Sequence, residues 1–138
     1  MAAEVFTQRF PVAAADIDEL GHVNNIVYLR YAQEMAIAHW RSRAPAEMLD
    51  AYVWVVVRHE VDYRAQLELG DDVEVRTWVD EAPRGPSWIR FVEVYKAGED
   101  KPSAQIKSNW VMLDAQTRRM KRVPLELAAR FMSDQNAG

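Results

Sequence analysis

The chain has 138 residues, 49% of them hydrophobic and 28% charged, which fits one globular domain that we expect to cover residues 1–138. A formal charge of -4 argues against a general nucleic-acid-binding surface, and the lack of cysteine excludes disulfides, thiolate nucleophiles and cysteine metal sites. No stretch approaches the roughly 20 apolar residues of a membrane span, and the N-terminus lacks the apolar segment of a signal peptide, so we expect a cytoplasmic protein without membrane insertion.

The first third of the chain is predicted to hold one strand and one long helix. Residues 5–11 are typical of a short strand. Asn24 and Asn25 suit the N-cap of a helix that runs from Ile26 to about Ser42, with Pro45 as its stop signal. Polar residues occupy one narrow stripe of this helix and nearly all others are apolar. We therefore expect a central helix that is buried on most sides and wrapped by a sheet.

Four further runs, rich in β-branched and aromatic residues, are predicted to be strands: residues 52–63, 73–79, 88–95 and 104–113. In the first run the odd-numbered positions are almost all apolar and the even-numbered ones are mixed. The short connections predict a mainly antiparallel sheet of about five strands. Pro124 then begins a short terminal helix over residues 125–132, so the fold class is α+β. Apolar residues that such a sheet leaves uncovered favour an oligomer.

Residues 16–25, DIDELGHVNN, place acid–base groups directly before the long helix. The first amide N–H groups of a helix have no partner inside it and lie at the positive end of its dipole, so they can hold a developing oxyanion. Asp18 is then a general base or a nucleophile, or else a cap or turn carboxylate. Asp16 is expected to be structural and to accept backbone N–H bonds. Two roles stay open for His22: it orients substrate or tunes Asp18, or it donates to a loop carbonyl and fixes the turn.

The longer segment DIDELGHVNNIVYLRYAQE resembles the active-site segment of hotdog-fold thioesterases of the 4-hydroxybenzoyl-CoA type. It is also similar to the Asp-x-Asn-x-His-Val-Asn-Asn segment of plant acyl-ACP thioesterases. Later elements of that family are matched in order by VVVRHEVDYRAQLELGDDVEVRT, PRGPSWIRF, SNWVMLD and VPLELAARF, so the resemblance covers nearly the whole chain. It implies a hotdog fold, in which an antiparallel sheet wraps a long helix, with two protomers joined edge to edge and acyl-CoA sites at their interface.

By motif position, the resemblance implies that Asp18 is the catalytic carboxylate and that the backbone N–H of Asn25 polarises the thioester carbonyl. His22 matches the imidazole of the plant enzymes. Leu20 stands where the plant motif has a side-chain amide, and the later cysteine of those enzymes has no counterpart in this chain. These departures favour a mechanism with a single carboxylate and weaken the catalytic role of His22.

Candidate substrate-binding residues are spread over several predicted elements. Tyr28, Trp54, Trp78, Trp88 and Trp110 are available to line an aromatic or a fatty-acyl pocket, and core packing explains most of them equally well. Arg58 and His59 are unusual in an apolar strand and face either the ligand or the dimer seam, while Ser87 either contacts the acyl or pantetheine arm or caps its turn. Arginine suits the phosphates of CoA. The local basic residues are Arg84, Arg90, Arg118, Arg119, Lys121 and Arg122.

The expected function is hydrolysis of an acyl-CoA or acyl-ACP thioester by a homodimer or tetramer, with no metal or redox cofactor. Glu34 is a secondary catalytic candidate, because another branch of hotdog thioesterases has its carboxylate on this helix. Its default role is a buried ion pair with Arg30 or a bond to the backbone. The alternatives are a hotdog hydratase or dehydratase acting on acyl thioesters, and a non-enzymatic acyl-CoA-binding module.

Overall fold

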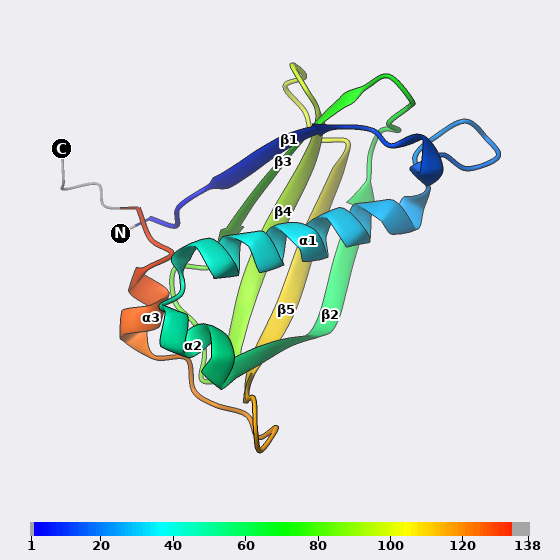
Figure 1. The fold of residues 1–138 in the computed structure, drawn as a ribbon. Helices are drawn as coiled ribbons and strands as arrows, with labels where there is room; N and C mark the ends of the chain where they lie inside the picture. Colours follow the sequence, from blue (N-terminus) through cyan, green and yellow to red (C-terminus); the bar gives the residue numbers. More distant parts are fainter. Residues whose placement is uncertain (1, 134–138) are drawn as a thin grey trace.

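The computed structural model describes residues 2–133, in which one curved antiparallel sheet holds a long helix across its face (Figure 1). The strand order is β1-β3-β4-β5-β2. The strands are β1 (Phe6–Pro11), β2 (Tyr52–Tyr63), β3 (Asp72–Val79), β4 (Ser87–Lys96) and β5 (Ala104–Asp114). The helices are α1 (Asn25–Arg43), α2 (Ala46–Ala51) and α3 (Leu125–Ala129). This is the hotdog fold, so the predicted fold class is confirmed.

The helix α1 begins and ends where its sequence signals it. The side chain of Asn24, the N-cap residue, accepts a hydrogen bond from the Ile26 N–H at 3.3 Å, and Pro45 follows the C-cap. Apolar residues at three- and four-residue spacing face the sheet and are buried. On the opposite side, however, Ile26 is 70% exposed and Ile37 is 47% exposed. The helix packs with one face, and the prediction that it is buried on most sides is wrong.

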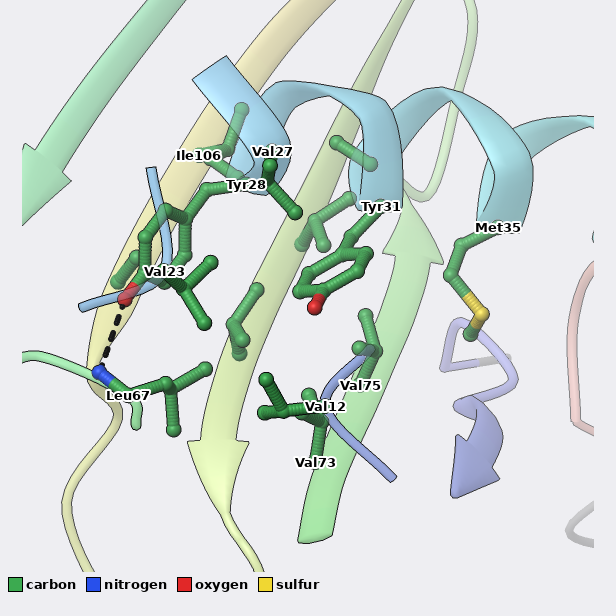
Figure 2. Close-up of a cluster of buried hydrophobic side chains, with 14 residues drawn as sticks. Val12, Val23, Val27, Tyr28, Tyr31, Met35, Leu67, Val73, Val75 and Ile106 are labelled. Atoms are coloured by element: carbon green, nitrogen blue, oxygen red, sulfur yellow. Dashed lines mark hydrogen bonds between the residues drawn. The ribbon is translucent and has the colours of Figure 1, made fainter. Parts of the chain in front are cut away.

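Two hydrophobic clusters fill the space between α1 and the sheet. The first lies under the N-terminal half of α1 and joins Tyr28 and Tyr31 to valines of β3 (Figure 2). The dashed line in Figure 2 marks the Leu67 N–H donating to the Tyr28 hydroxyl at 3.2 Å. The second cluster lies toward α3 and includes Trp88 and Phe131.

A row of buried polar side chains separates the two clusters. On β3, Thr77 lies between Val75 of the first cluster and Val79 of the second. On β4, Arg90 lies between Val92 and Trp88 in the same way. The other two members of this polar row are His39 on α1 and Ser108 on β5. The helix α1 and the three inner strands β3, β4 and β5 thus each contribute one polar residue to this row.

The strand β2 lies at one edge of the sheet, with β5 as its neighbour. Its register against β5 shifts between Val56 and Arg58, which leaves one extra residue in β2. Before the shift Val56 opposes Trp110, and after it His59 opposes Ser108. Even-numbered residues before the bulge therefore lie on the same face of the sheet as odd-numbered residues after it. The apolar odd-numbered face that the sequence predicts does not continue through the strand.

The predicted strand bounds agree with the structure to within about one residue. α2 was not predicted, because Pro45 served as a stop signal for α1, whereas it also occupies the N-cap position of α2. α3 ends at Ala129, three residues before the predicted end. None of the helices between residues 2 and 133 combines the length and the apolar character that a membrane crossing requires.

Candidate functional site

Residues 16–25 fold into a tight turn that delivers the chain to α1. The Asp18 N–H donates to the His22 carbonyl at 2.8 Å, and the Gly21 N–H donates to the Asp18 carbonyl at 3.0 Å. Gly21 adopts a φ of 84°, which favours glycine. Oδ1 of Asp18 accepts from the N–H groups of Leu20 at 2.9 Å and of His22 at 3.3 Å. The backbone of the turn therefore fixes the half-buried Asp18 carboxylate through one of its two oxygens.

The first turn of α1 leaves an amide available at its start. Asn25 is the first residue of the helix, and its N–H has no hydrogen-bond acceptor in the described part of the chain. The preceding Asn24 N–H donates to the Asp16 carbonyl at 2.9 Å, and the Tyr63 hydroxyl donates to the Asn25 carbonyl at 3.0 Å. These bonds hold the backbone on both sides of the amide. The N–H of Asn25 is thus a donor at the positive end of the helix.

Besides its carbonyl, Asp16 supports this turn through its side chain, whose partner is an arginine and not the backbone. Arg30 donates from Nη1 to Oδ1 at 2.8 Å and from Nη2 to Oδ2 at 2.5 Å. These bonds lower the pKa of the buried Asp16 carboxyl. The expectation that Asp16 accepts backbone N–H bonds is replaced by this bidentate pair. Arg30 also contacts Glu34 at 3.3 Å, but Glu34 is 63% exposed, so that ion pair is not the buried one that was predicted.

The ring of His22 donates to no loop carbonyl in residues 2–133. Its Nδ1 is buried without a hydrogen-bond partner among residues 2–133. Its Nε2 lies 3.8 Å from Oε1 of Glu68, which is 65% exposed. The imidazole therefore lies beside the Asp18 turn, and it is the His22 backbone N–H, not the ring, that contacts the Asp18 carboxylate.

A cavity of about 940 Å³ lies between the C-terminal half of α1, α2 and the sheet. Its aromatic lining residues are Trp40, Tyr52, Trp54, Trp88, Trp110 and Phe131. Five successive residues of β2, numbers 52–56, also line it, so the cavity reaches the free edge of that strand. Sequence reasoning offered three of the four tryptophans as pocket residues, but it did not locate the cavity, because α1, α2 and the four strands β2 to β5 build it together.

The structure does not gather the predicted substrate-binding residues into one place. Tyr28 is 1% exposed in the first cluster. Arg58 is exposed and pairs with Glu60 at 2.9 Å. Nδ1 of His59 lies 2.6 Å from the Ser108 hydroxyl, and burial lowers the pKa of the His59 imidazole.

Two further groups of predicted residues lie on turns. Ser87 closes the turn before β4 through two backbone bonds with Arg84, at 2.8 and 3.0 Å. Arg118 and Arg119 are exposed on the turn after β5, where Arg118 has a φ of 62°. This turn lies at the α2 end of the sheet, since the Ala115 N–H donates to the Ala51 carbonyl at 2.9 Å.

Arg90 differs from these exposed arginines, because it is 7% exposed and lines the cavity beneath α1. Its Nη1 donates to His39 Nδ1 at 3.0 Å and to Thr77 Oγ1 at 2.9 Å. On the other side of the ring, His39 Nε2 lies 3.1 Å from Oε1 of Glu4, which also accepts from Arg43 at 2.7 Å. Sequence reasoning placed Arg90 among the basic residues for CoA and missed this network.

The turn before α1 offers two reactive groups, the carboxylate of Asp18 and the backbone amide of Asn25. In residues 2–133, no group of three His, Asp or Glu side chains is placed to hold a metal ion. An anchored carboxylate and an open helix amide lie in one turn, and the cavity lies further along the same helix.

Residues 12–131 match the model of a family described as the thioesterase-like superfamily. Two chloroplastic palmitoyl-acyl carrier protein thioesterases are similar in sequence over 137 residues, the one from Gossypium hirsutum at 31% identity and the one from Cuphea hookeriana at 28%. Each alignment covers 89% of this chain, and the chain spans only 32% of the length of these relatives.

Two solved structures show the same fold. The 1,4-dihydroxy-2-naphthoyl-CoA thioesterase from Synechocystis has a TM-score of 0.79 at 18% identity, with 98% of this chain and 100% of that chain covered. A thioesterase from Thermus thermophilus, complexed with coenzyme A and Zn, has a TM-score of 0.78 at 28% identity, with 96% of this chain and 100% of that chain covered.

Proposed function

Since the chain belongs to the thioesterase-like superfamily, we propose that it hydrolyses acyl-CoA thioesters in the manner of the 4-hydroxybenzoyl-CoA type, to a free acid and CoA. The observation that carries this proposal is the turn before α1. It combines an amide without an internal acceptor, that of Asn25, with a carboxylate that the backbone holds in place, that of Asp18.

Both groups have a defined part in the reaction. Asp18 either takes a proton from the water that adds to the thioester carbon, or adds to that carbon itself to form an anhydride that water then opens. In both routes the carbonyl oxygen becomes negative, and the Asn25 N–H at the positive end of α1 stabilises it. The C–S bond then breaks, and the CoA thiolate leaves and is protonated.

We further propose that the active site is shared between two protomers. The edge strand β2 offers unpaired backbone groups, and its Val55 and Val57 are 40% and 58% exposed, so a second copy of β2 can extend the sheet. The Tyr63 contact places the Asn25 amide at the C-terminal end of β2. Antiparallel pairing about a two-fold axis sets that end beside the N-terminal end of the other β2, where the cavity lies.

This arrangement brings the reacting groups of one protomer to the cavity of its partner. Within one protomer, the cavity residue Ala36 lies about 16 Å along the helix axis from Asn25, at 1.5 Å per residue. The two-fold pairing removes that separation. The acyl group then enters the cavity of one subunit while its thioester lies over the helix start of the other.

The experiment is thiol release from a panel of acyl-CoA and acyl-ACP substrates, with the variants Asp18→Asn and Asp18→Ala. The Asn variant keeps Oδ1 as an acceptor for the two turn amides, so it preserves the turn while removing the base or nucleophile. We expect it to lower kcat by on the order of 10² or more. Asp100→Asn, at an exposed carboxylate between β4 and β5, is the matched control and keeps wild-type rates.

Three results would contradict the proposal. The role of Asp18 is wrong if a folded Asp18→Asn protein hydrolyses as fast as the wild type. Hydration of an enoyl-CoA without thiol release identifies a hydratase instead. Acyl-CoA binding that leads to neither reaction identifies a binding module.

A further inference from the structure

Arg90 is a buried cation that lines a cavity whose walls are mostly aromatic and aliphatic. On β4 it lies between Trp88 and Val92, both buried on the side of the sheet that faces α1. It is 7% exposed, and it lines the cavity together with Trp88 and Trp54. Removing a guanidinium from water is costly unless a partner compensates for its charge. The identity of its partners therefore decides what this residue does.

The partners of Arg90 within the protein are neutral. Thr77 donates its own hydroxyl proton to the Phe91 carbonyl at 2.8 Å, so it meets Arg90 with an oxygen lone pair. His39 faces Glu4 through Nε2, which places the ring proton there and leaves Nδ1 as the acceptor for Arg90. Burial and the nearby Arg90 lower the pKa of His39 to about 4, so the ring is uncharged at neutral pH.

Arg90 keeps its charge and has no counter-ion among residues 2–133. Burial lowers its pKa only to about 10, so the guanidinium is protonated at neutral pH. Within the described residues no carboxylate forms an ion pair with it; Glu4 lies beyond His39 and is shared with Arg43. Asp50 lines the same cavity but is exposed at the surface. Moreover, both hydrogen bonds of Arg90 use Nη1 alone, so Nε and Nη2 have no acceptor in residues 2–133.

We propose that Arg90 binds a carboxylate at the far end of the acyl group, so that the preferred substrates are CoA thioesters of dicarboxylic acids. This inference rests on the proposed function, and it adds the class of acid. Nε and Nη2 of one guanidinium match the two oxygens of a carboxylate in a bidentate pair. The aromatic walls cover the carbon chain or ring between the carboxylate and the thioester. His39 and Thr77 hold the guanidinium in position without neutralising it.

The first experiment compares matched acyl-CoA pairs that differ only in the terminal carboxylate. Adipoyl-CoA against hexanoyl-CoA, with shorter and longer homologues, tests chains, and 4-carboxybenzoyl-CoA against benzoyl-CoA tests rings. We expect wild-type kcat/KM to favour the carboxylated member of at least one pair by on the order of 30-fold or more. A wild-type preference for the uncharged member of every pair overturns the inference without any variant.

Substitutions then assign the preference to Arg90. We expect Arg90→Met to reverse it, because the apolar side chain leaves a substrate carboxylate without a partner. Arg90→Lys keeps the charge but not the bidentate geometry, so its preference falls between those of the wild type and Arg90→Met. Arg130→Met, at an exposed arginine after α3, is the matched control. If Arg90→Met and Arg90→Lys are folded and keep the wild-type preference, Arg90 is not the carboxylate receptor.

A binding measurement separates this inference from the proposed hydrolysis. Monomethyl adipate has one carboxylate and one ester, whereas methyl hexanoate has only the ester, and the cavity tryptophans report binding by fluorescence. We expect the wild type to bind monomethyl adipate on the order of 30-fold more tightly, and Arg90→Met to lose this difference. Such binding without thiol release from any thioester refutes the hydrolase but supports the carboxylate site. Thiol release without any selective binding of the carboxylate supports the hydrolase and refutes the site.

Discussion

Asp18 is positioned by the peptide backbone, which sets it apart from two other buried or half-buried carboxylates, Asp16 in the same turn and Glu4 at the opposite end of α1. Asp16 and Glu4 are held by arginines, whereas Oδ1 of Asp18 is held by the N–H groups of Leu20 and His22. A backbone anchor directs the carboxylate without placing a cation beside it. The second oxygen, Oδ2, takes no part in these bonds, which suits a group that must accept a proton or attack a carbon.

The buried His39 makes a specific prediction about stability and pH. Its pKa is lowered from 6.5 to about 4, so between these values the unfolded chain binds a proton that the folded protein does not. Stability is therefore highest above pH 6.5 and falls as the pH drops toward 4. Between pH 7 and pH 5 we expect a loss of roughly 2 kcal/mol, measured by urea unfolding.

The variant His39→Gln tests this assignment, because it keeps polar atoms at the site but does not titrate. We expect the pH dependence between 7 and 5 to become clearly shallower in this variant. A remaining slope is expected from His59, whose pKa is also lowered by burial. Equal slopes in the two proteins would show that His39 is not the group responsible.

Sequence reasoning proposed Asp18, His22 and Asn25 as site residues because they belong to one contiguous motif, and the structure has them in one turn before α1. It did not find the network around Arg90, since each of its hydrogen bonds joins residues that are far apart in the chain. His39 lies 35 positions from Glu4 and 51 from Arg90. Nothing in the local sequence distinguishes Arg90 from the exposed arginines.

The edge strand β2 leads to a prediction about assembly. Val57 lies in the bulge of β2 and is 58% exposed. Val57→Lys places a charge on the edge that we propose to pair with a second copy, so we expect sedimentation to show more monomer and thiol release to fall with it. Val5→Lys is the control, because Val5 is 55% exposed beside β1, at the opposite edge of the sheet. Monomer formation by both variants, or by neither, argues against pairing through β2.

The strands were predictable because alternating or continuous β-branched runs are bounded by clear turn signals. The bulge in β2 was not predictable from the sequence, because residues 55 to 57 are all valine and give no sign of a change of face. The shift depends on the pairing of β2 with β5. Its consequence is large, since it turns both Val56 and His59 toward the α1 side. α2 was missed for a related reason: a proline that stops one helix also begins the next.

A site shared by two subunits predicts complementation between two inactive proteins. Asp18→Asn removes the reacting carboxylate, and Ala36→Phe places a ring in the cavity. In a mixed dimer, one active site contains both changes and the other contains neither. After unfolding and refolding of an equal mixture, we expect thiol release to recover to about one quarter of the wild-type value, since half of the dimers are mixed.

The unmixed variants and a mixture that was never unfolded serve as controls for this experiment. Both should stay at the low activity of the single variants. Mixed dimers that form, as shown by a tag on one variant, yet remain inactive would place Asp18 and the cavity of the same protomer in one site.

The polar row of Thr77, Arg90, Ser108 and His39 divides the core into two parts, each of which supports a different region of the protein. One part, with Tyr28 and Tyr31, supports the start of α1, where we propose that the thioester is cleaved. The other part, with Trp88 and Phe131, borders the cavity that we propose to hold the acid. We therefore expect that replacing residues of the second part, even Arg90 by an apolar residue, changes the acids that the protein accepts and leaves the proposed cleavage groups at the start of α1 in place.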